Sequence, residues 1–184
     1  MNTSAPTQHS WFALRVRPKM ERIASLTLSG KNYEIFLPLY RLRRTWSDRS
    51  KVLDAPLFPG YLFCFLNPKE RLMPVLTTPG VISIVSAGHE PLPIPAADLD
   101  AVKAIIQSGL PAQPWPLLTA GTTVFIEKGP LAGVEGIALD VDRRHRLIVS
   151  VPLLQRSIAV EIERHWVRPV TGVPCRRSIA HQTA

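Results

Sequence analysis

The sequence has few of the residues from which catalytic and metal sites are usually built. Its 184 residues include two cysteines, Cys64 and Cys175, and five histidines. The cysteines lie far apart, with neither the spacing of a zinc site nor the density of a disulfide framework, which fits a reducing compartment. We find no phosphate-binding loop, nucleophile–base pattern or metal-ligand spacing. An enzyme is therefore disfavoured, and we expect no cofactor and no metal.

Long apolar runs are also missing. No stretch approaches the roughly 18 apolar residues that a membrane span needs. Residues 1–10 lack the basic start and apolar run of a signal peptide. We therefore expect a soluble, cytoplasmic, monomeric protein with no membrane partner.

Positive charge, by contrast, is abundant and unevenly placed. The formal net charge is +8. Residues 1–51 contain ten Lys or Arg against three Asp or Glu, whereas residues 52–108 contain three against five. Because phosphate backbones attract clustered cations, this asymmetry indicates a polyanion near the N-terminal part. Solubility alone would explain the same excess.

The most informative apolar stretch is residues 56–65, PLFPGYLFCF. From Tyr61 onward it is apolar on both alternating faces, which indicates a central strand covered on both sides. Its first half contains two prolines, which cannot donate to a sheet, so we expect Phe58 near the surface at the entrance to this strand. From the residues alone, Phe58 is either a lid on the core or an anchor for a partner.

Periodicity over residues 11–108 predicts an α+β sandwich with a mostly antiparallel sheet. We expect strands at residues 11–16, 33–39, 61–66 and 81–85, and helices from Pro18 to Gly30, after Asn67, and at residues 96–107.

Two groups of basic residues stand out in this domain. One crowds the junction of the first strand and helix, where a helix N-terminus favours a phosphate: Arg15, Arg17, Lys19 and Arg22. The other lies on the arms of a predicted hairpin around residues 47–50, with Trp46 interleaved: Arg41, Arg43 and Arg44. Basic arms with an aromatic residue are typical of nucleic-acid binding. A charged hairpin edge that resists aggregation has the same pattern.

The C-terminal part has a different composition. Residues 109–118 contain three prolines and no periodicity, which predicts a semi-stiff linker. Residues 122–170 contain short strands separated by turns, and so few residues bury one face only by curling into a small barrel. We expect strands at 124–126, 134–140, 146–151, 157–162 and 167. The predicted organisation is a disordered tail 1–10, a domain 11–108, a linker 109–118, a barrel 119–170 and a disordered tail 171–184.

The most specific run is residues 124–137, VFIEKGPLAGVEGI. Gly129, Pro130, Gly133 and Gly136 occur where two strands must turn and approach closely. This run resembles the KOW motif, a small barrel of ribosomal proteins and transcription elongation factors. Combined with Trp11-Phe12, the basic hairpin, the 58–63 stretch and Thr78-Pro79-Gly80-Val81, the chain resembles the NusG family of transcription factors over most of its length. That resemblance implies an N-terminal NusG-type (NGN) α/β sandwich, a Pro-rich linker and a C-terminal all-β KOW barrel.

The resemblance also implies partners. In this family the first domain binds the clamp of the largest RNA polymerase subunit and suppresses pausing. The matching patch here consists of Phe58, Pro59, Tyr61 and Phe63, which favours the anchor interpretation of Phe58. The residues Arg15, Arg17, Lys19 and Arg22 lie where specialised relatives meet the non-template DNA strand. The KOW barrel would meet a ribosome, the Rho terminator or RNA.

Two departures bear on the kind of family member. Housekeeping members typically have Gly-Pro-Phe in the KOW loop, where this chain has Leu131, and Phe-Gly-Arg later in the barrel, where it has residues 151–156. Those aromatics belong to the surface that meets Rho or a ribosomal protein. The departures favour an operon-specific antiterminator of the RfaH or UpxY-like kind. The alternatives are a housekeeping NusG acting with Rho or the ribosome, and a ribosomal-type KOW RNA-binding protein.

Overall fold

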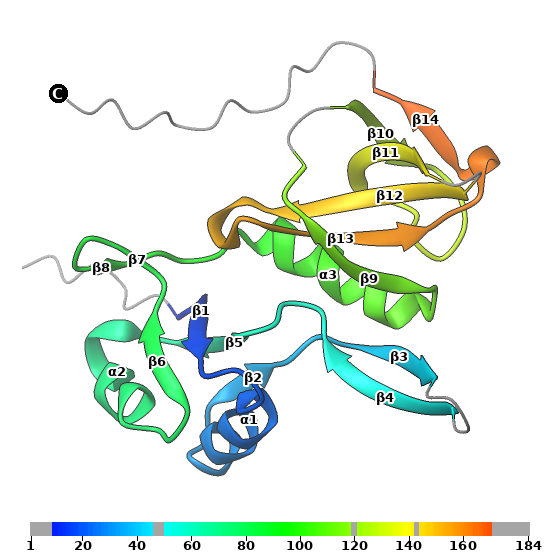
Figure 1. Cartoon of the computed structure of the whole chain (residues 1–184). Helices are drawn as coiled ribbons and strands as arrows, with labels where there is room; N and C mark the ends of the chain where they lie inside the picture. The colour runs from blue at the N-terminus through cyan, green and yellow to red at the C-terminus, as the bar shows by residue number, and fades with distance from the viewer. Residues whose placement is uncertain (1–8, 46–49, 119–120, 142–143, 171–184) are drawn as a thin grey trace, which may run out of the picture.

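The computed structural model describes residues 9–45, 50–118, 121–141 and 144–170 (Figure 1). The N-terminal part is built on a four-stranded antiparallel sheet in the order β2-β5-β1-β6. Its strands are β1 (Ser10–Val16), β2 (Glu34–Phe36), β5 (Tyr61–Leu66) and β6 (Val81–Ile84). β5 lies between β1 and β2, so the prediction of a central strand after Pro59 is confirmed.

Two helices cover one face of this sheet: α1 (Glu21–Gly30) and α2 (Pro68–Leu76). Leu14, Leu28, Leu62, Cys64 and Val75 belong to the buried cluster beneath them. We call this side the helix-covered face. The Asn67 side chain caps α2 by accepting a hydrogen bond from the Lys69 N–H at 3.2 Å, as the sequence predicted.

The start of α1 differs from the prediction. The helix begins at Glu21, and Pro18 lies before it rather than in its first turn. Lys19 has a φ of 68°, a left-handed conformation that cannot belong to a right-handed helix. The helix ends at Gly30, as expected.

The predicted basic hairpin is confirmed. β3 (Leu39–Thr45) and β4 (Ser50–Pro56) form a two-stranded sheet of their own, extending away from the four-stranded sheet (Figure 1). Trp46 lies outside the described residues. A small second hairpin, β7 (Ser86–Ala87) and β8 (Glu90–Pro91), follows β6.

The C-terminal part is a six-stranded antiparallel sheet in the order β14-β10-β11-β12-β13-β9. Its strands are β9 (Ala112–Pro116), β10 (Thr122–Ile126), β11 (Glu135–Val141), β12 (Arg144–Val151), β13 (Arg156–Glu161) and β14 (Val167–Pro169). Two short 3₁₀ helices complete it, η1 (Pro152–Leu154) and η2 (Arg164–Trp166). The five strands from β10 onward match the prediction.

The predicted linker is not free of regular structure. Its residues 112–116 form β9, which pairs with β13, so that part of the expectation is wrong. The carbonyl and N–H of Leu118 also bond to the hydroxyls of Ser150 and Ser157, at 3.2 and 3.3 Å. Prolines at alternate positions leave this edge strand able to pair on one side.

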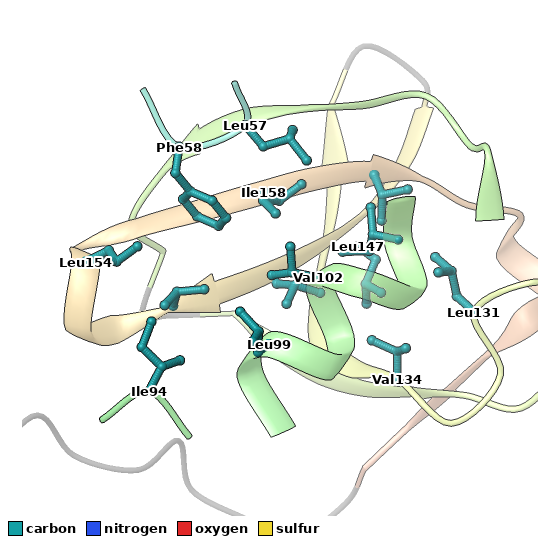
Figure 2. Packing of buried hydrophobic residues seen from close by; sticks show 14 of the residues in the cluster. Leu57, Phe58, Ile94, Leu99, Val102, Leu131, Val134, Leu147, Leu154 and Ile158 are labelled. Atoms are coloured by element: carbon teal, nitrogen blue, oxygen red, sulfur yellow. The ribbon is translucent and has the colours of Figure 1, made fainter. Parts of the chain in front are cut away.

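The third helix, α3 (Ala96–Ser108), lies against the barrel strands (Figure 1). Its buried side chains Leu99, Val102 and Ile105 belong to one continuous cluster with the barrel residues Leu147 and Ile158. Figure 2 shows Leu99, Val102, Leu147 and Ile158 pointing into the same space. The same cluster includes Phe63 of β5, on the sheet face opposite α1 and α2. We call this second side the barrel-covered face.

Candidate functional site

Two Pro-Gly turns flank the end of β1. In residues 58–61 the Tyr61 N–H donates to the Phe58 carbonyl at 3.0 Å, and in residues 78–81 the Val81 N–H donates to the Thr78 carbonyl at 3.0 Å. The third residues, Gly60 and Gly80, have φ of 83° and 90°. Proline second and a positive-φ glycine third is the pattern of a type II turn. Both turns lie beside β1 because β5 and β6, which follow them, pair with β1 on its two sides.

These turns are bonded to the strand that separates them. The Val16 N–H donates to the Gly60 carbonyl at 2.8 Å, and the Arg17 N–H donates to the Gly80 carbonyl at 2.8 Å. Successive backbone donors at the end of β1 are thus satisfied by one turn each. The basic junction and the two turns therefore form one hydrogen-bonded unit.

The predicted patch lies on the barrel-covered face. Phe58 is 1% exposed and Phe63 0%, whereas Tyr61 is half-buried and Pro59 exposed. The Phe58 and Phe63 rings meet edge to face with their centroids 5.6 Å apart. The expectation that Phe58 lies near the surface is wrong, because the C-terminal barrel covers it.

The barrel supplies the cover with apolar side chains. Leu154, from η1, and Ile158, from β13, share the buried cluster of Phe58 (Figure 2). Leu131 of the KOW loop is also fully buried there. The position at which the chain departs from the housekeeping pattern thus faces the interior in this conformation.

The glycines of the predicted motif join two strands of the barrel. Gly129, Pro130 and Gly133 lie in the connection between β10 and β11, and Gly136 lies on β11 opposite Val124. A Cβ at Gly136 would come 2.7 Å from the carbonyl oxygen of Ile148 on the neighbouring strand. A larger residue would force the two strands apart, so the close approach requires glycine.

The basic residues of the β1–α1 junction are exposed: Arg15, Arg17, Lys19 and Arg22. Arg22 Nη2 lies 3.0 Å from Asp54 Oδ2 of β4, which links the junction to the hairpin. Arg41 is exposed on β3 opposite Asp54, and Arg43 and Arg44 lie further along the same strand. Asp54 was not singled out from the sequence, because a lone acidic residue on a strand carries no local signal.

A second contact that sequence reasoning missed involves α3. The Lys103 ammonium nitrogen lies 4.9 Å from the centroid of the Trp11 ring and 6.0 Å from that of Phe36. Both aromatic rings are half-buried at the margin of the barrel-covered face. Such cation–π contacts join residues far apart in sequence, so periodicity does not reveal them.

The described residues offer little catalytic chemistry. No group of three or more potential metal ligands gathers among them. Burial raises the pKa of the Cys64 thiol from 9.0 to about 12, against a smaller opposing effect of Arg71. A thiol with so high a pKa is a poor nucleophile near neutral pH. No helix in this part of the chain has the length and apolar character needed to cross a bilayer.

The chain is a two-domain protein in which an α+β sandwich is joined to a small antiparallel β domain. The family model described as "Transcription termination factor nusG" matches residues 9–103, just over half of the chain. The chain therefore belongs to the NusG family, whose members are transcription termination/antitermination factors and not enzymes.

Named relatives agree with this assignment. The chain is 26% identical to the transcription termination/antitermination protein NusG of Pseudomonas aeruginosa over 159 residues, covering 84% of this chain and 90% of the relative. It is 28% identical to NusG of Thermus thermophilus over 159 residues, covering 78% and 84%. The solved structure "Domain interaction in Thermotoga maritima NusG" matches with a TM-score of 0.59 at 17% identity, over 90% of this chain and 99% of that one. This match confirms the predicted fold class.

Proposed function

We propose that this factor binds RNA polymerase through the patch of Phe58, Pro59, Tyr61 and Phe63 and suppresses pausing and termination at a restricted set of operons. One observation carries the proposal. The sheet face that bears these aromatics is covered by α3 and the C-terminal barrel rather than by helices α1 and α2. Buried aromatics that a partner can uncover are typical anchors of protein interfaces.

Binding through this patch requires the barrel to move away. Phe58 is 1% exposed in the closed arrangement and offers no surface to a partner. Polymerase then binds the fraction of molecules in which the barrel has separated, and its apparent affinity falls by that fraction. The chain between α3 and β9 is residues 109–111, so separation pivots on a short connection.

Nucleic acid is the second partner we propose. Arg15, Arg17, Lys19 and Arg22 would contact DNA of the elongation complex, and Arg41, Arg43 and Arg44 of the hairpin would extend this contact. Cations that neutralise phosphates release counterions, so this part of the binding depends on salt. The DNA contact would hold the polymerase-bound factor close to the paused site.

The restricted role rests on the barrel. Where housekeeping relatives have an aromatic residue in the KOW loop, Leu131 is fully buried. A buried leucine presents no surface to Rho or to a ribosomal protein in the closed arrangement. We therefore propose operon-specific antitermination, with a ribosome, Rho or RNA as later partners of the separated barrel.

Single-round transcription by a bacterial RNA polymerase through pause and terminator sites tests the proposal. We expect faster passage with the factor present, and loss of both this effect and polymerase binding in Tyr61→Ala and Phe58→Ala. Met73→Ala is the matched control, because Met73 is 67% exposed on α2, the opposite side of the sheet. Templates with different leader sequences distinguish operon-specific from general action.

Each component of the proposal has a contrary outcome. Wild-type polymerase affinity in both aromatic variants would remove the anchor assignment. Absence of polymerase binding by the wild-type protein and by its Leu154→Asp variant, which opens the domain interface, would instead favour an RNA-binding protein. Reversal of charge at Arg15 and Arg17 should reduce the salt dependence of DNA binding. An unchanged slope would remove the junction from the DNA contact.

A further inference from the structure

Glu21 is a buried acidic residue among exposed basic ones. It begins α1 and is 6% exposed, whereas its neighbour Arg22 and the junction residues Arg15, Arg17 and Lys19 are exposed. A buried carboxylate is costly unless its oxygens are hydrogen-bonded. Its Oε1 accepts a hydrogen bond from the Gly60 N–H at 3.0 Å. The side chain therefore points inward, to the turn that precedes β5.

With this bond, both the N–H and the carbonyl of Gly60 are hydrogen-bonded to residues near the basic junction. Glu21 holds the Gly60 N–H, while the N–H of Val16 holds the Gly60 carbonyl at 2.8 Å. These two residues lie on either side of the connection between β1 and α1, because Val16 ends β1 and Glu21 begins α1. The peptide groups on either side of Gly60 are thus oriented by residues next to the basic junction, although Gly60 and Glu21 are 39 residues apart in sequence.

The second Pro-Gly turn is held differently. Its Gly80 carbonyl also accepts a hydrogen bond from β1, but Gly80 packs against the side chain of Met20, whose Cβ would lie 3.0 Å from a Cβ added at the glycine. The contact of Gly80 itself is apolar and non-directional, and the charge-assisted hydrogen bond to this turn runs from the Lys31 ammonium to the Thr78 hydroxyl at 2.7 Å. In the turn that carries the aromatic patch, the charge-assisted bond is made to the glycine N–H itself.

We propose that Glu21 is a positioning residue for polymerase binding. Its carboxylate fixes the turn of residues 58–61 against the β1–α1 junction, so that the aromatic patch and the basic junction present one rigid surface to polymerase and DNA. This inference rests on the proposed function of the patch. Charge-assisted hydrogen bonds are shorter and stronger than neutral ones, and they hold direction as well as distance. A loosened turn would let Phe58 and Tyr61 adopt several orientations and would weaken binding.

Three substitutions of Glu21 separate hydrogen bonding from charge. Glu21→Gln keeps an acceptor oxygen at the same reach and loses the charge. Glu21→Asp keeps the charge and is one methylene too short. Glu21→Ala removes both. Each is placed in the full chain carrying Leu154→Asp, so that masking by the barrel does not limit binding, and Glu90→Ala, an exposed glutamate on β8, controls for loss of one negative charge.

Polymerase affinity and the Gly60 amide resonance are measured for each variant. We expect Glu21→Asp and Glu21→Ala to lose at least about tenfold in affinity, the size of one charge-assisted hydrogen bond. Their Gly60 amide should move upfield and exchange faster with solvent. Glu21→Gln should retain affinity within about threefold and keep the Gly60 signal, because the acceptor remains.

The outcomes separate this inference from the proposed function. Affinity equal to that of the parent in Glu21→Asp, with the Gly60 signal shifted, would overturn the positioning role and leave the patch intact. If the parent itself does not bind polymerase, the proposed function fails and the positioning role fails with it. If Glu21→Ala does not fold, the comparison of Glu21→Asp with Glu21→Gln tests the inference, since both variants keep a polar group at this position. Loss of affinity in Glu21→Gln with full affinity in Glu21→Asp would also overturn the inference, because charge rather than hydrogen bonding would then matter.

Discussion

The two faces of the N-terminal sheet are buried in different ways. The helix-covered face lies under α1 and α2, which are close to the sheet strands in sequence, and its cluster contains Leu62, Cys64 and Leu66 of β5. The barrel-covered face bears Phe63 of the same strand, and its cover comes from α3 and the C-terminal barrel. One strand thus contributes to two clusters whose covers differ in origin.

The difference suggests which contact is permanent. Local helices cannot leave the sheet without unfolding the domain, whereas a barrel with its own sheet can separate as a unit. Phe12 and Tyr33 belong to the helix-covered face, but more aromatic residues lie on the side with the separable cover: Trp11, Phe36, Phe58, Tyr61 and Phe63. Four predictions test this contrast, from the largest expected effect to the smallest.

Truncation on the helix-covered face should have the largest effect. Leu62→Ala leaves a cavity under α1 and α2, and we expect it to lower the free energy of unfolding of the N-terminal domain by about 2–5 kcal/mol. Leu99→Ala is the matched truncation on the barrel-covered face. Because the barrel can separate, we expect this variant to weaken the contact between the domains and to lower the free energy of unfolding by less. Denaturant unfolding of both variants measures the contrast. Equal losses would mean that the two faces unfold as one unit.

A charge inserted beneath the barrel should disrupt the contact between the barrel and the N-terminal sheet without unfolding either domain. Leu154 is 4% exposed in η1. In Leu154→Asp we expect the open form to gain about thirtyfold, or about 2 kcal/mol, because the carboxylate reaches water only when the barrel separates. NMR relaxation should then show two domains tumbling independently. Gln155→Asp places the same charge at an exposed neighbour and should leave one tumbling unit.

Burial of Cys64 on the helix-covered face should also make the free energy of unfolding depend on pH. Burial raises the pKa of Cys64 to about 12 in the folded chain, from 9.0. The folded state therefore keeps its proton where the unfolded state has lost it, and stability falls as pH rises from 9.0 toward 12. At pH 10 the loss relative to pH 7 should be about 1 kcal/mol. Cys64→Ala should lack this component in denaturant titrations at both pH values; an identical slope in the variant would assign it elsewhere.

The link between the basic junction and the hairpin should matter least for stability. Arg22 and Asp54 have side chains 58% and 51% exposed. Asp54→Asn should change the free energy of unfolding by less than about 1 kcal/mol, since exposed ion pairs contribute little. Loss of this negative charge should raise affinity for DNA at low salt. A larger loss of stability would mean that the pair anchors the hairpin to the sheet.

Local chemistry made much of the fold predictable. Apolar residues on both faces identified β5 as a central strand, helical spacing identified α3, and Asn67 marked the start of α2. The start of α1 was predicted too early because Lys19 has a left-handed backbone conformation. A glycine at this position would have indicated such a conformation, but a lysine does not. β9 was missed because its prolines, at positions 114 and 116, are rare in strands and are tolerated here only at a sheet edge.

The candidate site, like the fold, could be predicted from the sequence only in part. Residue type and local spacing predicted the basic junction and the turn glycines, and the resemblance to the NusG family implied the aromatic patch; as binding sites, these stay predictions. Only the tertiary structure decided that Phe58 is covered by the barrel and that Glu21 holds Gly60. The physical reason is that an apolar pattern requires burial without specifying what provides it, since the hydrophobic effect is non-directional. Specific partners are decided where distant segments meet, by shape and by directional hydrogen bonds such as the one between Glu21 and Gly60.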